Sequence, residues 1–263
     1  YEVGVRLVGS EMCIRDSYNS ERLKYNQMNY NNDVELDNFC SQCLLVINAV
    51  GPSFKINDKI ALHALRNNCH YIDIGGYGIL RDLLKPYEKS IEAQKLCFII
   101  GVGWMPGISG VFSKTIIETH LNSPENTNFN IYYGAVDNWS YSSTYDLAAS
   151  SMGKTRSYVY SHGKEIQVSP FRYTHHKFFP FIGHKKICMP SFDEQLTQLA
   201  TSLKQIRKIS TFIMLNDYIS MGKFMFIKIF YKHNLNKATL MLQDDYQLSL
   251  IHISEPTRRT PIS

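Results

Sequence analysis

The 263-residue sequence contains no apolar run long enough to cross a lipid bilayer. Its densest apolar segment, residues 224–230, is far shorter than the ~20 residues that a membrane helix needs, and it includes Lys228. The excess of positive over negative charge is also small, with 28 basic and 23 acidic residues. The sequence has no basic cluster interleaved with aromatic residues, which would indicate nucleic-acid binding. We therefore expect a soluble, cytoplasmic protein that binds neither a membrane nor nucleic acid.

Regularly spaced metal ligands are scarce as well. Cys40 and Cys43 form a single Cys-x-x-Cys, which could be a redox pair or half of a zinc site, but no second pair follows. The remaining cysteines have no regular spacing, so reduced and mostly buried thiols are the better interpretation. His175 and His176 are neighbours, and neighbouring side chains of a strand point to opposite faces. We expect no metal site.

A Gly-x-Gly-x-x-Gly sequence, which holds a dinucleotide pyrophosphate at a helix N-terminus, occurs nowhere in the chain. What is present is an alternation of three short apolar runs, residues 44–47, 71–74 and 96–100, with two segments of helical periodicity. The runs lack strict polar alternation, as expected for parallel strands covered on both faces. The pattern predicts a β-α-β-α-β unit, with a helix at residues 55–67 and a second helical stretch at residues 80–91. Pro86 lies inside the second stretch, which could be two helices or one kinked helix.

Small residues follow each predicted strand, in residues 48–52 (NAVGP), 75–76 (GG) and 101–107 (GVGWMPG). Open α/β sheets bind ligands at the carboxyl ends of their strands, where small residues let a ligand approach the backbone. These segments, together with residues 69–74 (CHYIDI), resemble the saccharopine dehydrogenase family over about residues 22–120.

The resemblance implies an α/β protein with two domains. Residues 18–107 would form a partial Rossmann-type parallel sheet for NADP or NAD, and residues 108–247 a mixed α/β domain for substrate binding and dimerisation. The implied reaction is hydride transfer between NAD(P) and an imine or amino-acid derivative. In the family the missing glycine motif would precede residue 18, so we expect a fragment that is inactive by itself, from a parent that is possibly a homodimer.

The resemblance also implies site residues. Those expected at the cofactor are Asn48, Ala49, Val50, Gly51, Pro52, Tyr71, Asp73, Gly103 and Trp104. Those expected at a small amino-acid-like substrate are Trp104, Tyr141, Asp146 and Arg172. Asp73 could instead be a structural cap and Trp104 an inter-domain packing residue, and the sequence does not indicate a general acid. A rival interpretation is a non-catalytic nucleotide-binding or dimerisation protein on the same scaffold.

The second half changes from buried runs to alternation. It predicts strands at residues 129–133, 157–161, 164–168 and 208–215, and helices at residues 108–120, 192–203 and 218–232. In the first of these helices, Ile108, Val111 and Phe112 should belong to the buried stripe.

The two ends do not resemble protein sequence. Residues 6–16 and 248–258 can be encoded by a DNA string and its reverse complement, which resembles a sequencing adapter. We expect residues 1–17 and 248–263 to be adapter-like tails outside the fold. The alternative, that they are genuine tails, requires the complementarity to be coincidental.

Overall fold

The computed structural model divides the chain into two compact units, residues 1–111 (unit 1) and 112–263 (unit 2). The tails predicted at residues 1–17 and 248–263 lie outside the residues that the structure describes. The described residues are 27–75, 78–103, 106–120, 128–134, 140–152, 158–162, 164–180, 182–191, 195, 198–200, 206–215, 218–231 and 234–243.

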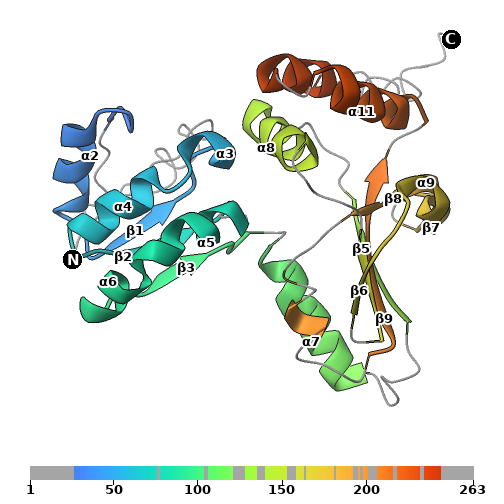
Figure 1. The fold of residues 1–263 in the computed structure, drawn as a ribbon, viewed down its shortest axis with the longest axis horizontal. Coiled ribbons are helices and arrows are strands. Elements are labelled where there is room, and N and C mark those ends of the chain that lie inside the picture. The colour runs from blue at the N-terminus through green and yellow to red at the C-terminus, as the bar shows by residue number, and fades with distance from the viewer. Residues whose placement is uncertain are drawn as a thin grey trace, which may run out of the picture. The chain divides into compact units, whose positions relative to one another are not determined.

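Unit 1 contains the predicted parallel sheet, which confirms the α/β class (Figure 1). Its strands are β1 (Leu45–Asn48), β2 (His70–Asp73) and β3 (Phe98–Ile100), in the order β1-β2-β3. Asn48 pairs with Asp73, which pairs in turn with Ile100, so the three carboxyl ends reach the same edge of the sheet. In a doubly wound sheet, each half adds its successive strands outward from the centre of the sheet. The order β1-β2-β3 matches the strand order of one such half.

Both helical stretches predicted between the strands of unit 1 are divided into shorter helices. The helices of unit 1 are α2 (Asp33–Cys40), α3 (Ser53–Ile56), α4 (Lys59–Arg66), α5 (Gly78–Leu84), the 3₁₀ turn η1 (Lys85–Tyr87) and α6 (Glu88–Ala93). The predicted helix at residues 55–67 is interrupted at Asn57, whose φ of 50° and ψ of −131° are not helical. Pro86 lies in η1 and separates α5 from α6, as its missing N–H dictates.

The core of unit 1 lies on one face of the sheet. Val46 and Tyr71 are adjacent across β1 and β2 and pack with buried side chains of α2, α4 and α5. The opposite face is apolar but uncovered by described residues, with Leu45, Ile47 and Ile99 exposed by 41, 52 and 46%. The prediction of strands buried on both faces is therefore confirmed for one face only.

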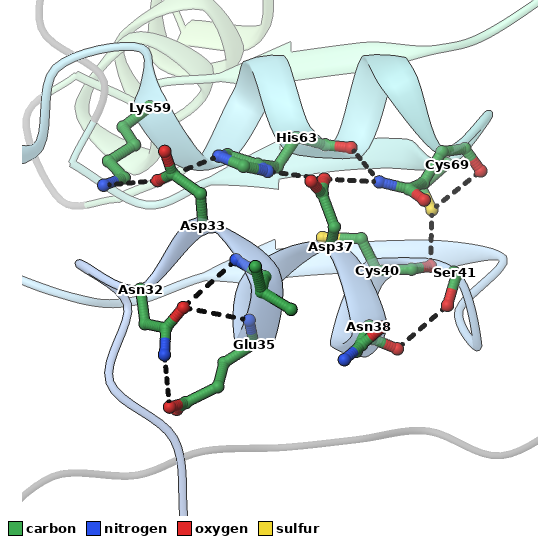
Figure 2. A network of polar contacts seen from close by, with 12 residues as sticks. Asn32, Asp33, Glu35, Asp37, Asn38, Cys40, Ser41, Lys59, His63 and Cys69 are labelled. Atoms are coloured by element: carbon green, nitrogen blue, oxygen red, sulfur yellow. Dashed lines mark hydrogen bonds and ion pairs between the residues drawn. The ribbon is translucent and has the colours of Figure 1, made fainter.

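A polar network joins α2 to α4 (Figure 2). The His63 side chain is 2% exposed, and its Nδ1 lies 2.6 Å from Asp37 Oδ1. Because a carboxylate only accepts, Nδ1 carries the proton of this bond. Lys59 Nζ lies 2.8 Å from Asp33 Oδ1, and Asn32 is the N-cap of α2, since its side chain accepts from two backbone amides. These polar contacts connect α2 with α4 within the helical layer.

Unit 2 is built on a mixed, mainly antiparallel six-stranded sheet. Its strands are β4 (Asn128–Tyr133), β5 (Tyr158–Ser161), β6 (Lys164–Gln167), β7 (His175–Phe179), β8 (His184–Ser191) and β9 (Lys208–Leu215). The sheet order is β6-β5-β9-β8-β7, and β4 pairs in parallel with β9. The strands predicted at residues 157–161 and 164–168 are present as the antiparallel pair β5 and β6, in which Ile166 is 47% exposed.

The second half of the chain contains the helices α7 (Ile108–His120), α8 (Tyr141–Met152), α9 (Pro170–Tyr173) and α11 (Tyr218–Phe230). A further helix spans residues 235–243, and only residues 195 and 198–200 of the helix predicted at 192–203 are described, as helical. In α7 the predicted stripe is wrong. Ile108, Val111 and Phe112 are exposed by 62, 67 and 65%, whereas Ser113 and Ile117 are buried, so the helix is turned relative to the apolar pattern.

Candidate functional site

The candidate site lies at the carboxyl edge of the three-stranded sheet. Backbone hydrogen bonds continue past the strands, from Ile74 N to Asn48 O at 3.2 Å and from Val102 N to Asp73 O at 3.0 Å. They bring the segments after all three strands together. Of the residues predicted to contact a cofactor, Ala49 and Gly51 are exposed at this edge, whereas Val50 is half-buried and Pro52 is buried.

Three buried polar side chains form a closed triad below this edge. Tyr71 Oη donates to Asp73 Oδ2 at 2.6 Å, and Asn48 Nδ2 donates to the same oxygen at 2.7 Å. Asn48 Nδ2 also lies 3.0 Å from Tyr71 Oη, while its Oδ1 accepts from Val50 N at 3.0 Å. All four groups come from β1, β2 and the turn after β1. The carboxylate is therefore held by two donors in a fixed orientation.

The three residues of the triad have different roles. Tyr71 is fully buried under the helical layer, and burial, followed by the charge of Asp73, raises the pKa of its hydroxyl well above its usual value. A phenol in this state stays protonated and keeps donating. Asp73 is 3% exposed and Asn48 is 6% exposed. We therefore interpret Tyr71 and Asn48 as residues that position Asp73, rather than as groups that touch a ligand.

The loop after β3 is wound tightly against the end of β2. Gly103 N donates to Pro106 O at 3.0 Å, and Ile108 N donates to Gly103 O at 2.9 Å, which starts α7. A Cβ on Gly103 would lie 2.5 Å from Ile74 O, and one on Gly107, where φ is 129°, would lie 2.2 Å from Gly103 O. Only glycine fits both positions. Trp104, expected between cofactor and substrate, lies outside the described residues.

Apart from Trp104, the residues predicted to contact a substrate lie in unit 2. Tyr141 and Asp146 are both on α8; the Tyr141 hydroxyl donates to Asn236 Oδ1 at 2.9 Å, and Asp146 is 7% exposed. Arg172 lies on α9 and is exposed. The expectation that these three residues meet one substrate remains a prediction.

Other chemistry-bearing residues take structural positions. Cys40, Cys69 and Cys188 are buried and Cys43 is half-buried, whereas Cys97, expected in a covered strand, is exposed. Burial raises the pKa of the Cys40 thiol to about 12. His175 and His176 bond to different tyrosines, as their opposite faces predict. Among the residues that the structure describes, no three His, Cys, Asp or Glu side chains come together as metal ligands.

Sequence reasoning missed two residues near the triad, Ser53 and Asn57, which line a small pocket with Asp73 and Asn48. Asn57 has positive φ outside the left-handed helical region, a conformation that costs on the order of 1–3 kcal/mol in a residue other than glycine. The signal in the sequence is weak, because an Asn-Asp pair inside a helical pattern predicts only a cap or a turn.

Comparison with solved structures shows which fold contains this edge. The chain is similar to the histidine-tagged apo saccharopine dehydrogenase (L-Glu forming) from Saccharomyces cerevisiae, with a TM-score of 0.58 at 19% sequence identity. The match covers 85% of this chain and 53% of that one, so this chain spans about half of its neighbour's length. No family model and no curated protein matches the sequence.

The likeness therefore establishes a saccharopine dehydrogenase-like fold, with a Rossmann-type parallel sheet followed by a second domain. A search for membrane-spanning helices finds none of sufficient length and apolarity in the described part of the chain.

Proposed function

We propose that the chain belongs to an NAD(P)-dependent oxidoreductase of the saccharopine dehydrogenase type, which transfers a hydride between NAD(P) and an imine or amino-acid derivative. The observation that carries the proposal is the convergence of three glycine-bearing strand ends at one edge, above a carboxylate held in place by Asn48 and Tyr71. In open α/β sheets this edge is where ligands bind. The similar fold of a saccharopine dehydrogenase supports the same assignment.

The residues present fit the nicotinamide half of a dinucleotide. Ala49 and Gly51 are exposed next to β1, and Gly103 lets the loop after β3 pack closely against Ile74 at the same edge. The cofactor supplies the hydride chemistry when bound, and the protein supplies position and polarity. Asp73 would contact the cofactor through the edge, and its two donors keep it from turning. Tyr141, Asp146 and Arg172 are proposed to contact the amino-acid-like substrate.

This chain should bind the complete dinucleotide weakly and be inactive by itself, because none of its 263 residues forms the glycine motif that holds the pyrophosphate. Each charge-assisted hydrogen bond is worth ~1.5–3 kcal/mol, so two or three missing bonds weaken affinity by several powers of ten. Titration of the chain with NADPH, followed by NADPH fluorescence, measures this. Micromolar affinity would show that the pyrophosphate is bound by other residues than the proposal requires.

The position of the nicotinamide half can be tested separately. We expect nicotinamide mononucleotide to shift the amide resonances of Gly51, Gly75 and Gly103 in a ¹⁵N-labelled chain. Gly51→Leu should abolish these shifts and leave the resonances of unit 2 unchanged, because Gly51 is exposed at the edge and does not belong to the core. Shifts confined to other residues would contradict the proposed site.

A second candidate function, a non-catalytic dimerisation module, has one specific observation in its favour. Ile108, Val111 and Phe112 form an exposed apolar stripe along the first turns of α7, which is suited to a protein interface. We propose that the parent protein is a homodimer in the cytoplasm, where the free thiols would stay reduced. Val111→Glu should lower the mass measured by sedimentation equilibrium if this stripe is the interface, and Thr119→Glu on the same helix serves as a control.

A further inference from the structure

The hairpin of β7 and β8 in unit 2 carries a concentration of positive charge. Between Glu165 and Asp193 the sequence has no Asp or Glu, whereas it contains Arg172, Lys177, Lys185 and Lys186 together with His175, His176 and His184. Within the part of the chain that the structure describes, no carboxylate forms an ion pair with Lys177 or Lys185. The described residues therefore leave the positive charge of these two side chains without an opposite charge.

The register of the hairpin places this charge on both faces of the sheet. Lys177 of β7 is directly opposite Lys186 of β8, so the two side chains leave the same face, where like charges repel each other. Phe178 is opposite Lys185 on the other face, because side chains alternate along a strand. Lys177 and Lys185 are exposed, and Phe178 is exposed by 50%. The hairpin therefore presents a lysine on each face and an aromatic ring beside one of them.

β7 is also the last strand in the order of the six-stranded sheet. In the order β6-β5-β9-β8-β7, its one strand neighbour among the described residues is β8. The outward N–H and C=O groups of an edge strand can pair with another extended chain. Lysine on an edge can serve only to prevent such pairing between copies of a protein. Here the exposed ring of Phe178 accompanies the charge and offers an incoming chain an apolar contact.

We propose that β7 binds an acidic peptide segment of a partner protein, which adds to the sheet as a further strand. Main-chain hydrogen bonds along the edge would provide affinity, and alternate side chains would provide specificity. Acidic residues on one face of the added strand would lie beside Lys177, and apolar residues on its other face would contact Phe178. An anionic membrane also attracts lysine, but a bilayer meets one face of a sheet, whereas a peptide at the edge meets both. The lysines on both faces therefore favour a peptide.

The test is a titration of a fluorescent peptide with the whole chain, followed by anisotropy. The probe is a short peptide of alternating Glu and Val residues with blocked ends, and its anisotropy should rise to saturation. The affinity should fall as NaCl is added, because salt screens charges at a protein surface. A peptide of the same sequence with every amide N-methylated should not bind, because it has lost the donors that pair with a strand.

Variants of the chain locate the binding site. Lys177→Glu and Lys185→Glu should each weaken binding at least about threefold, since an attraction becomes a repulsion. Phe178→Ser should also weaken binding, but it should leave the dependence on NaCl unchanged. Lys164→Glu is the matched control, because it makes the same charge change at an exposed lysine of β6, the strand at the other end of the sheet order. All four side chains are exposed, so each variant should fold.

Three results would overturn the proposal: a flat titration up to about 200 µM chain, equal weakening by Lys164→Glu and Lys177→Glu, or unchanged binding of the N-methylated peptide. Vesicles of phosphatidylserine and phosphatidylcholine test the other source of negative charge. Sedimentation of the chain with these vesicles, together with a flat peptide titration, would overturn the proposal in favour of a membrane surface. No nucleotide is present in these measurements, so their outcome is independent of the proposed oxidoreductase function.

Discussion

Removing one hydroxyl group from the triad should destabilise unit 1 by a measurable amount. Tyr71→Phe keeps the ring, which lies 5.4 Å from the ring of Phe98, and deletes only the hydroxyl, which donates to Asp73 Oδ2 at 2.6 Å and lies 3.0 Å from Asn48 Nδ2. A hydrogen bond to a charged group contributes about 1.5–3 kcal/mol, and Tyr71 is fully buried, so solvent cannot replace it. We expect the free energy of unfolding to fall by that amount, which corresponds to about 6 °C or more in Tm for a domain of this size.

The assay must follow unit 1 alone, because two units can unfold separately. Cys69 is fully buried in unit 1 and Cys188 is fully buried in unit 2, so thiol labelling at increasing urea, read by mass spectrometry, reports each unit. The urea midpoint for Cys69 should fall in Tyr71→Phe, and that for Cys188 should not. Tyr87→Phe, at a residue 36% exposed, is the control. A loss below about 0.5 kcal/mol, the range of ordinary surface substitutions, would refute the argument that the triad is a tight unit.

Three further perturbations have definite expected outcomes. The hydrogen bond from a buried histidine holds the pKa of Asp37 below its ordinary value of 3.8, so its contribution to stability is complete above that pH and is lost as the pH falls further; Asp37→Asn should flatten the acid limb of a stability–pH curve. Cys97 should react with Ellman's reagent before Cys40, which is buried and has its pKa raised to about 12. Gly107→Ala should destabilise the chain by more than ~1 kcal/mol in urea denaturation, whereas Gly222→Ala, with open space around it in α11, should stabilise it by ~0.5–1 kcal/mol.

Each of these three predictions has an outcome that would contradict it. An unchanged acid limb in Asp37→Asn would mean that the bond to His63 contributes nothing to folding. Fast labelling that survives Cys97→Ser in a chain that also carries Cys13→Ser would show that another thiol is accessible. Equal effects of alanine at both glycines would show that the close approach of Gly103 O to Gly107 is not a constraint.

The sequence predicts elements well where one periodicity dominates. The strand at residues 208–215 and the helix at residues 108–120 coincide with β9 and α7, because their apolar residues repeat consistently. It fails where the conformation of a single residue interrupts a helix, as at Asn57, since a positive φ at a residue other than glycine depends on the tertiary surroundings. The sequence also fails to predict which face of a helix is buried. Ile108 and Val111 have the spacing of a buried stripe, but periodicity shows only that such residues lie on the same side of the helix.

The sheet edge that carries the candidate site could be located from the sequence, but the contacts at this edge could not. Strand ends and small residues follow from the alternation of runs, so the edge with Gly51 and Gly103 could be located from the sequence. The distinction between Asp73 and the residues that hold it could not, because it depends on the register of Asn48 against β2. That register arises when the helical layer covers Val46 and Tyr71, and it has no local sequence signal.

The connectivity of the two sheets sets an order of assembly during synthesis. In unit 1, Asn48 pairs with Asp73 and Asp73 with Ile100, so each strand joins a neighbour that left the ribosome shortly before. In unit 2, Asn128 pairs with Lys208 across most of that unit, and β9 also carries β5 and β8. Loop closure on that scale is slow, and the central strand is made last. Unit 1 can therefore fold before β9, with which β4, β5 and β8 pair, has been synthesised.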